Sequence, residues 1–303
     1  MGDLFPEKWL GEAAAIGTAV LWTLSTLAWT SAGRHVGALA VSFIRLLLTC
    51  LFLAPYEMLA RGSPLPLDAD ARTWWLLCMS GLCGFFLGDV CLFKAFLIIG
   101  PRLSLLAQPL VPPVVAVISW IVLGDPLSLR QWVAMFITLA GVVWVVLEKP
   151  NDATHPYSRQ QLATGLLLAM LSVVGQAVGW ILSKQAIGQY DAVSATYIRV
   201  IGAIGGYVVL ITLLGRWPQM LLAVRNLQAM MVMTAGSLVG PFLGVVFSLE
   251  AVRRCHAGVV TTIVATMPVL ILPLVVVFYR EKVSLRAVVG AVVSVLGVAL
   301  LVL

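Results

Sequence analysis

An aspartate stands in the middle of an apolar run that is long enough to span a membrane. Asp89 lies in LLCMSGLCGFFLGDVCLFKAF, directly after Gly88. An ionisable group at membrane depth costs several kcal/mol unless it is paired or hydrated, so its presence indicates either a function or a specific partner. We expect Asp89 to exchange a proton or to bind a cationic group; the alternative is a purely structural carboxylate that hydrogen-bonds neighbouring helices.

Two arginines and one pair of opposite charges are further candidates for chemistry. Arg45 (in VSFIRLLL) and Arg199 (in ATYIRVIG) each lie a few residues inside an apolar run. We expect each to anchor its helix at the membrane interface, or alternatively to bind an anionic group such as a carboxylate. Lys94 and Glu250 either pair with each other near a symmetry axis or, as we favour, stay near the interface, where Glu250 has two arginines downstream.

Aromatic and amide side chains occur at matching places in two other apolar runs. Trp22 and Gln176 occupy equivalent positions, and Trp180 follows Gln176 by one helical turn on the same face. These side chains either line a pathway through the protein or pack between helices.

Prolines interrupt two more apolar runs, LLAQPLVPPVVAV and ATMPVLILPLV. Each proline removes a backbone donor and frees a carbonyl, which lipid tolerates only beside protein or water. We therefore expect a binding region at these breaks, next to the polar Gln108 and Thr266, with packing kinks as the alternative. The prolines are Pro109, Pro112, Pro113, Pro268 and Pro273.

The composition places all these residues in a membrane protein. The chain is 61% hydrophobic and 11% charged, and its mean hydropathy is +1.04, well outside the usual range of soluble proteins. Apolar spans of about 20 residues follow one another closely, and each predicts a transmembrane helix. The expected helices are 13–31, 38–60, 74–97, 102–123, 130–148, 162–183, 193–214, 226–249, 257–279 and 284–303.

The chain also repeats itself. Residues 84–147 align without a gap onto 240–303 with 15 identities in 64 positions, among them paired glycines, a paired proline and an SLR turn. Upstream, an offset of 154 pairs the two Ile-Arg dipeptides at Arg45 and Arg199. Two copies of one membrane unit are typical of transporters.

An odd number of helices per copy inverts the second copy in the membrane. The sequence therefore predicts an all-α membrane protein with ten transmembrane helices as two inverted five-helix repeats, residues 1–149 and 162–303. The polar segment 150–161 is the expected linker. Basic residues are divided almost equally between the two sides, so charge bias leaves the orientation open.

The fifth and tenth spans carry matching stripes of small residues, which allow close helix contact. The stripes form either the interface between the repeats or a homodimer face, and they consist of Ala134, Thr138, Gly141, Gly290, Ser294 and Gly297. The cysteines form no CxxC pair and the histidines lack metal-ligand spacing, so no metal or cofactor is expected. No basic tract suggests nucleic-acid binding.

The order of these features resembles the EamA-type family of the drug/metabolite transporter superfamily. The resemblance rests on the duplicated spans, the glycine-rich third span leading to Lys94-Ala95, the Gly100-Pro101 turn, Leu123 to Ser128, and Gly141-Val142. Glu281 keeps a glutamate that is usual in the family, whereas Asp125 replaces it. The resemblance implies a multi-pass protein of the bacterial inner membrane, with both termini cytoplasmic and with helices 1–4 and 6–9 around a cavity.

Together these observations predict a secondary transporter, in particular an exporter of small metabolites such as amino acids, that works by alternating access. Proton coupling through Asp89 is part of this hypothesis. The alternatives are a lipid flippase or a passive channel. An intramembrane aspartyl enzyme built from Asp89 and Asp191 is a remote third, because the chain lacks GxGD spacing, GxSG and HExxH.

Overall fold

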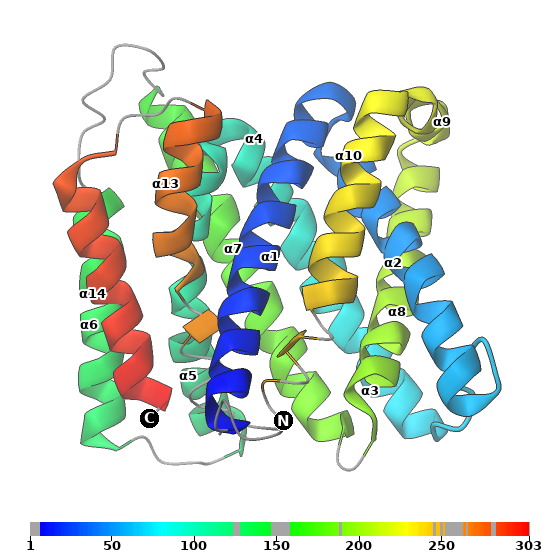
Figure 1. The fold of residues 1–303 in the computed structure, drawn as a ribbon, viewed down its shortest axis with the longest axis horizontal. Helices are drawn as coiled ribbons and strands as arrows, with labels where there is room; N and C mark the ends of the chain where they lie inside the picture. Colours follow the sequence, from blue (N-terminus) through cyan, green and yellow to red (C-terminus); the bar gives the residue numbers. More distant parts are fainter. Residues whose placement is uncertain are drawn as a thin grey trace, which may run out of the picture.

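The computed structural model shows a bundle of α-helices that run side by side (Figure 1). The first described helix begins and the last described helix ends at the same end of this bundle, at the bottom of the view. The described part of the chain contains no strand, as expected in lipid, because a helix satisfies its own backbone hydrogen bonds. The structure describes residues 7–123, 128–146, 158–187, 190–244, 247–248, 251, 263–264, 266–279 and 283–302.

The first half of the chain forms a series of long helices, two of which are interrupted. A π-helix interrupts the third expected span, and Gly100, with a φ of 76°, kinks the chain at the start of the fourth. The elements are α1 (Glu7–Val36), α2 (Ala38–Arg61), α3 (Ala71–Gly81), the π-helix η1 (Leu82–Gly88), α4 (Asp89–Leu105), the 3₁₀-helix η2 (Gln108–Leu110), α5 (Val111–Leu123) and α6 (Leu129–Val146).

The described elements of the second half follow the same order with one addition, and most of the residues equivalent to α4 and η2 lie outside the described part of the chain. A short helix, α9, comes before α10, and the side chain of Asn226 caps α10 by accepting a hydrogen bond from the Ala229 N–H at 3.0 Å. Most of the expected linker lies outside the described residues, and α7 begins slightly earlier than predicted. The elements are α7 (Arg159–Ile187), α8 (Ala192–Leu213), α9 (Trp217–Arg225), α10 (Leu227–Ser237), the π-helix η3 (Leu238–Gly244), α13 (Met267–Tyr279) and α14 (Leu285–Val302).

Length and composition identify membrane-spanning helices within the described residues. Six helices are long and apolar enough to cross a membrane. Large apolar side chains are exposed on the outer helices, for example Phe136 and Trp144 on α6, and in a bilayer they contact lipid. The six spans are Leu10–Val36, Ala38–Arg61, Ala71–Pro101, Arg159–Ser183, Val193–Leu213 and Leu227–Gly244.

The small-residue stripes join the two halves of the chain. Helices α6 and α14 pack together at one side of the bundle (Figure 1). A Cβ atom added to Gly141 would lie 2.7 Å from the Gly290 carbonyl oxygen, and one added to Gly297 would lie 2.5 Å from the Thr138 nitrogen. Because the stripes are used within the chain, they are not available as a homodimer face.

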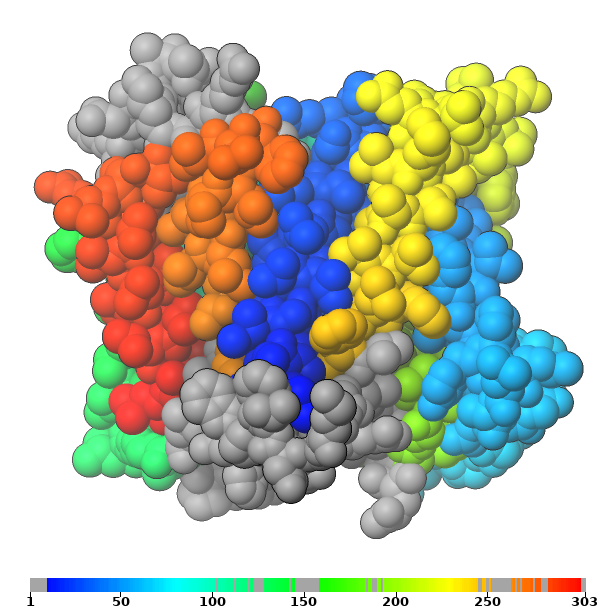
Figure 2. All heavy atoms as spheres, in the orientation of Figure 1, coloured from blue at the N-terminus to red at the C-terminus, as the bar shows by residue number. Residues whose placement is uncertain are grey.

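Other helices from the two halves also interleave. On the face shown in Figure 2, α1 lies between α10 and α13 of the second half. Helix α7 in turn packs against α3, η1, α4 and α5 of the first half. The interior of the bundle is therefore built jointly by both halves.

Candidate functional site

The two π-helices occupy equivalent positions in the repeats. The segments η1 (Leu82–Gly88) and η3 (Leu238–Gly244) are separated by the same offset of 156 that aligns the sequences. Pro241 lies inside η3 and cannot donate a backbone hydrogen bond, which disfavours a regular α-helix there. Because π-helical turns within α-helices occur frequently at functional sites, these segments focus attention on the residues around them.

Each π-helix packs against the first helix of the opposite repeat. Glycines bring η1 close to α7: a Cβ added to Gly179 would lie 3.2 Å from the Gly84 Cα, and one added to Gly175 would lie 3.2 Å from the Gly88 Cα. On the other side of the pseudo-symmetry, the indole N–H of Trp22 donates a 3.1 Å hydrogen bond to the η3 carbonyl of Gly240.

A buried tyrosine contacts two backbone carbonyls of the π-helix η1. The Tyr207 hydroxyl, on α8, lies 3.4 Å from the Phe85 carbonyl oxygen and 3.3 Å from that of Phe86. The Tyr207 side chain is fully buried, and its ring also packs edge-on against Phe86 with 4.8 Å between centroids. Sequence analysis did not select Tyr207, because a lone tyrosine in an apolar span carries no distinguishing pattern.

The aspartate and the first arginine form a buried ion pair. Asp89 is the first residue of α4, directly after η1, and it pairs with the guanidinium of Arg45 from α2; each side chain is only 10% exposed. The Arg45 guanidinium carbon also lies 4.9 Å from the Trp29 ring centroid and 5.2 Å from that of Phe93. The expectation that Arg45 reaches the interface is therefore wrong, because its charge has a partner inside the bundle.

The second arginine is equally buried but has a different environment. Arg199, on α8, is 8% exposed, and its guanidinium carbon lies 4.4 Å from the Phe85 ring centroid and 5.7 Å from that of Trp180. Its Nε has no hydrogen-bond partner. Interface anchoring is wrong for this arginine too. Asp89 forms an ion pair with Arg45, but the residue aligned with Asp89 in the second repeat is Val245.

Trp180 is exposed on a face of α7 that also carries fully buried residues. Val173, one heptad earlier, and Ala177, one turn earlier, are both fully buried, yet Trp180 is 53% exposed. The exposed Trp180 side chain lies beside Arg199. Gln176, also on this face, donates from its amide to the Ser172 hydroxyl at 3.0 Å.

The prolines of the fourth span coincide with a change of helix type. The chain passes from α4 through the short 3₁₀-helix η2 into α5. Pro109 and Pro113 are buried, and the Gln108 Nε2 lacks a hydrogen-bond partner. Pro112 lies in the first turn of α5. A break thus occurs near the predicted place and leaves a buried amide unsatisfied.

The equivalent region of the second half is described only from Thr266 onward, apart from a few isolated residues. The Thr266 hydroxyl donates to the Ile263 carbonyl at 2.6 Å, directly before α13. Pro268 falls in the first turn of α13, and Pro273 lies inside that helix. Lys94 is exposed, away from the buried face that carries Asp89. Glu250, its predicted symmetry mate, lies outside the described residues.

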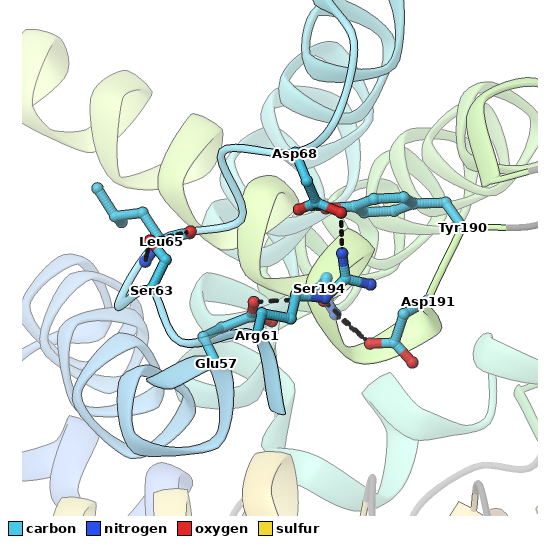
Figure 3. A network of polar contacts seen from close by, with 8 residues as sticks. All are labelled: Glu57, Arg61, Ser63, Leu65, Asp68, Tyr190, Asp191 and Ser194. Carbon is cyan, nitrogen blue, oxygen red and sulfur yellow. Dashed lines mark hydrogen bonds and ion pairs between the residues drawn. The ribbon is translucent and has the colours of Figure 1, made fainter. Parts of the chain in front are cut away.

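A polar network links the two repeats at one end of the bundle (Figure 3). Arg61, at the end of α2, pairs with Asp68, and the Tyr190 hydroxyl donates to the same carboxylate at 3.0 Å. The Arg61 guanidinium carbon lies 4.8 Å from the Tyr190 ring centroid. The Arg61 Nε is 3.8 Å from the fully buried carboxylate of Glu57. The network ties the α2–α3 connection of one repeat to the α7–α8 connection of the other.

Mutual contacts in this network stabilise the charge states present at neutral pH. Burial and then the hydrogen bond to Asp68 raise the pKa of Tyr190 to about 12. Slight burial raises the pKa of Asp68, but the hydrogen bonds from Tyr190 and Arg61 outweigh it and leave this pKa below its usual value. Sequence analysis missed the network because its members are about 120 residues apart.

The geometry gives no support to an aspartyl enzyme. Asp89 pairs with Arg45, whereas Asp191 is the N-cap of α8 and accepts hydrogen bonds from the Ser194 N–H at 2.9 Å and its hydroxyl at 3.0 Å. Within the described residues, no group of three or more His, Cys, Asp or Glu side chains is arranged to hold a metal ion.

Comparison with known proteins adds sequence and fold evidence. The model of the EamA-like transporter family matches residues 9–147 and 163–303. An uncharacterized transporter of Archaeoglobus fulgidus is 20% identical over 291 residues, which cover 95% of this chain and 96% of that protein. A solved structure, described only as the crystal structure of a protein, is 19% identical with a TM-score of 0.64, and the match covers 96% of this chain and 95% of that chain. The predicted fold class, ten transmembrane helices as two inverted five-helix repeats, is confirmed.

Proposed function

This chain belongs to the EamA-like transporter family and is a membrane transport protein, and from that premise we propose that it is a secondary exporter of small metabolites such as amino acids. Transport follows alternating access, with the two inverted repeats rocking about a shared interior. The bacterial inner membrane is the proposed location. A facilitator or channel and a lipid flippase are the competing activities.

The buried charges beside η1 carry this proposal. Arg45, Asp89 and Arg199 are each at least nine-tenths buried, in a bundle that presents apolar side chains to the bilayer. Ionisable side chains inside a transmembrane bundle are rare, and most of them mark substrate or ion pathways. Trp180 supplies an accessible aromatic surface beside Arg199, so polar and aromatic contacts for a small solute are both present.

The test is uptake into liposomes that contain the purified protein. Pools of labelled amino acids and other metabolites are supplied with and without a pH gradient, and protein-free liposomes are the control. Saturable uptake supports the carrier. Flux that does not saturate indicates a channel, and movement of labelled lipid between leaflets without solute uptake indicates a flippase.

Proton coupling through Asp89 is the finer part of the proposal. It is motivated by the burial of a carboxylate directly after the π-helix η1. Protonation of Asp89 would release Arg45, so one proton would change the contact between α2 and α4. We expect Asp89→Asn to abolish stimulation by a pH gradient. Uptake by this variant that is still stimulated to the wild-type extent would refute the coupling role.

A further inference from the structure

We propose that Arg199 is the recognition site for a carboxylate group of the transported solute. This inference rests on the proposed function and names the substrate class of the same interior. Its starting point is that Arg199 is 8% exposed and that no described carboxylate forms an ion pair with it. Burying a guanidinium without an anion is costly, which makes the position a functional candidate.

The comparison between the repeats indicates what the missing partner is. Arg45 and Arg199 are equivalent, and Arg45 has the carboxylate of Asp89. The position aligned with Asp89 in the second repeat is Val245, which cannot supply a charge. The chain provides a carboxylate for Arg45, and a solute carboxylate would take the equivalent place beside Arg199.

The surroundings leave hydrogen-bond donors available to such an anion. Phe85 and Trp180 interact with the charge of Arg199 through their rings, but they offer no strong acceptor to its N–H groups. The Nε is unpartnered. A Cβ added to Gly84 would lie 3.5 Å from Nη2, so the glycine keeps room about the size of a methyl group beside that nitrogen.

The approach to the site is aromatic and accessible. Trp180 is 53% exposed on the inward face of α7. A planar carboxylate suits a guanidinium because two parallel N–H···O bonds form at once. A carboxylate attached to an apolar or aromatic group would place its anion at Arg199 and its apolar part against Trp180.

Binding is tested with benzoate and its uncharged analogue benzamide. In detergent micelles at constant ionic strength, we expect benzoate to raise the thermal unfolding midpoint saturably and benzamide to leave it unchanged. Losing a charge-assisted hydrogen-bond pair weakens binding about 10-fold or more. Arg199→Gln should raise the half-saturating benzoate concentration by at least that factor. The control Arg225→Gln, at an exposed arginine of α9, should respond like the wild type.

Several results would overturn the site. An equal response to benzamide, or an unchanged benzoate response in Arg199→Gln, contradicts it. If that variant fails to fold, Arg199→Lys keeps the charge but loses the planar donor pair, and wild-type affinity in this second variant would also contradict the site.

Uptake of labelled amino acids separates this inference from the proposed function. Saturable uptake that benzoate does not inhibit refutes the carboxylate site while leaving the transporter. Benzoate binding that depends on Arg199, without uptake of any pool, supports the site and refutes the proposed substrates.

Discussion

Replacing Asp89 by asparagine should destabilise the protein by leaving a buried arginine without its counter-ion. Both side chains of the Arg45–Asp89 pair are 10% exposed, and removing one partner of a buried ion pair costs about 3–5 kcal/mol. The rings of Trp29 and Phe93, at 4.9 and 5.2 Å from the guanidinium carbon, remain in place. Because they still attract the charge, we expect the lower end, about 3 kcal/mol.

The measurement is the free energy of unfolding from denaturant titration in detergent micelles. The double variant Arg45→Met with Asp89→Asn removes the stranded charge, so we expect it to recover at least about 1 kcal/mol relative to the sum of the single losses. Additive losses in the double variant, or a loss below about 1 kcal/mol for Asp89→Asn, would refute the energetic role of the pair.

Two further predictions concern the contacts between repeats. Gly202→Ala should lower the free energy of unfolding by about 1–3 kcal/mol, because the added Cβ would lie 2.6 Å from the backbone Cα of Cys78. The control Gly205→Ala, whose added Cβ has nothing within 4 Å, should lose none. Equal thermal unfolding midpoints for the two variants would contradict the close packing of α3 on α8. Tyr190→Phe should lower the free energy of unfolding, measured by denaturant titration, by about 0.5–1.5 kcal/mol. The lowered pKa of Asp68 and the raised pKa of Tyr190, about 12, keep this difference constant from about pH 5 to about 9. The difference should begin to shrink below about pH 4, the ordinary pKa of aspartate, and be lost as the pH falls through the lowered pKa of Asp68. A difference that stays constant down to the lowest pH at which the protein remains folded would show that the carboxylate is not the acceptor.

The helical plan was predictable because the bilayer imposes it. Spans of apolar residues must be helical, and the internal repeat carried enough glycines and prolines to fix its own alignment. The interruptions inside the helices could be predicted only in part from the sequence. Glycines and prolines marked weak points in the sequence, but a single sequence does not reveal that η1 packs on α7 and η3 packs on α1.

The candidate site was predictable as a set of residue types and not as a set of partners. Asp89, Arg45 and Arg199 stood out because charge inside an apolar run is rare. Their pairing was not visible, because Asp89 has Lys94 nearby in sequence while its partner is 44 residues away. Glu57 was overlooked near a span end, although its side chain is fully buried beside Arg61.

The two repeats differ where they meet. Gly206, at the α8 contact with η1, would bring an added Cβ within 2.9 Å of the Phe86 ring. Its aligned position in the first repeat is Phe52, which instead packs against Phe242 with 6.2 Å between ring centroids. At one seam a glycine of α8 gives room to the Phe86 side chain of η1, whereas at the other two phenylalanine side chains pack against each other.

The polar network is one-sided in the same way. Arg61 and Tyr190 both contact Asp68. The aligned residues of the other repeat are Gly215 and Val36, which cannot form an equivalent ion pair or hydrogen bond. In the proposed alternating-access cycle, rocking of the two inverted repeats exchanges the roles of the two ends, so a network present at only one end would make the two conformations unequal in free energy. A solute shifts such an equilibrium only by binding one conformation more tightly than the other. In the proposed transport cycle, any conformation that separates the two connections joined by this network would have to recover the free energy of its contacts from solute binding.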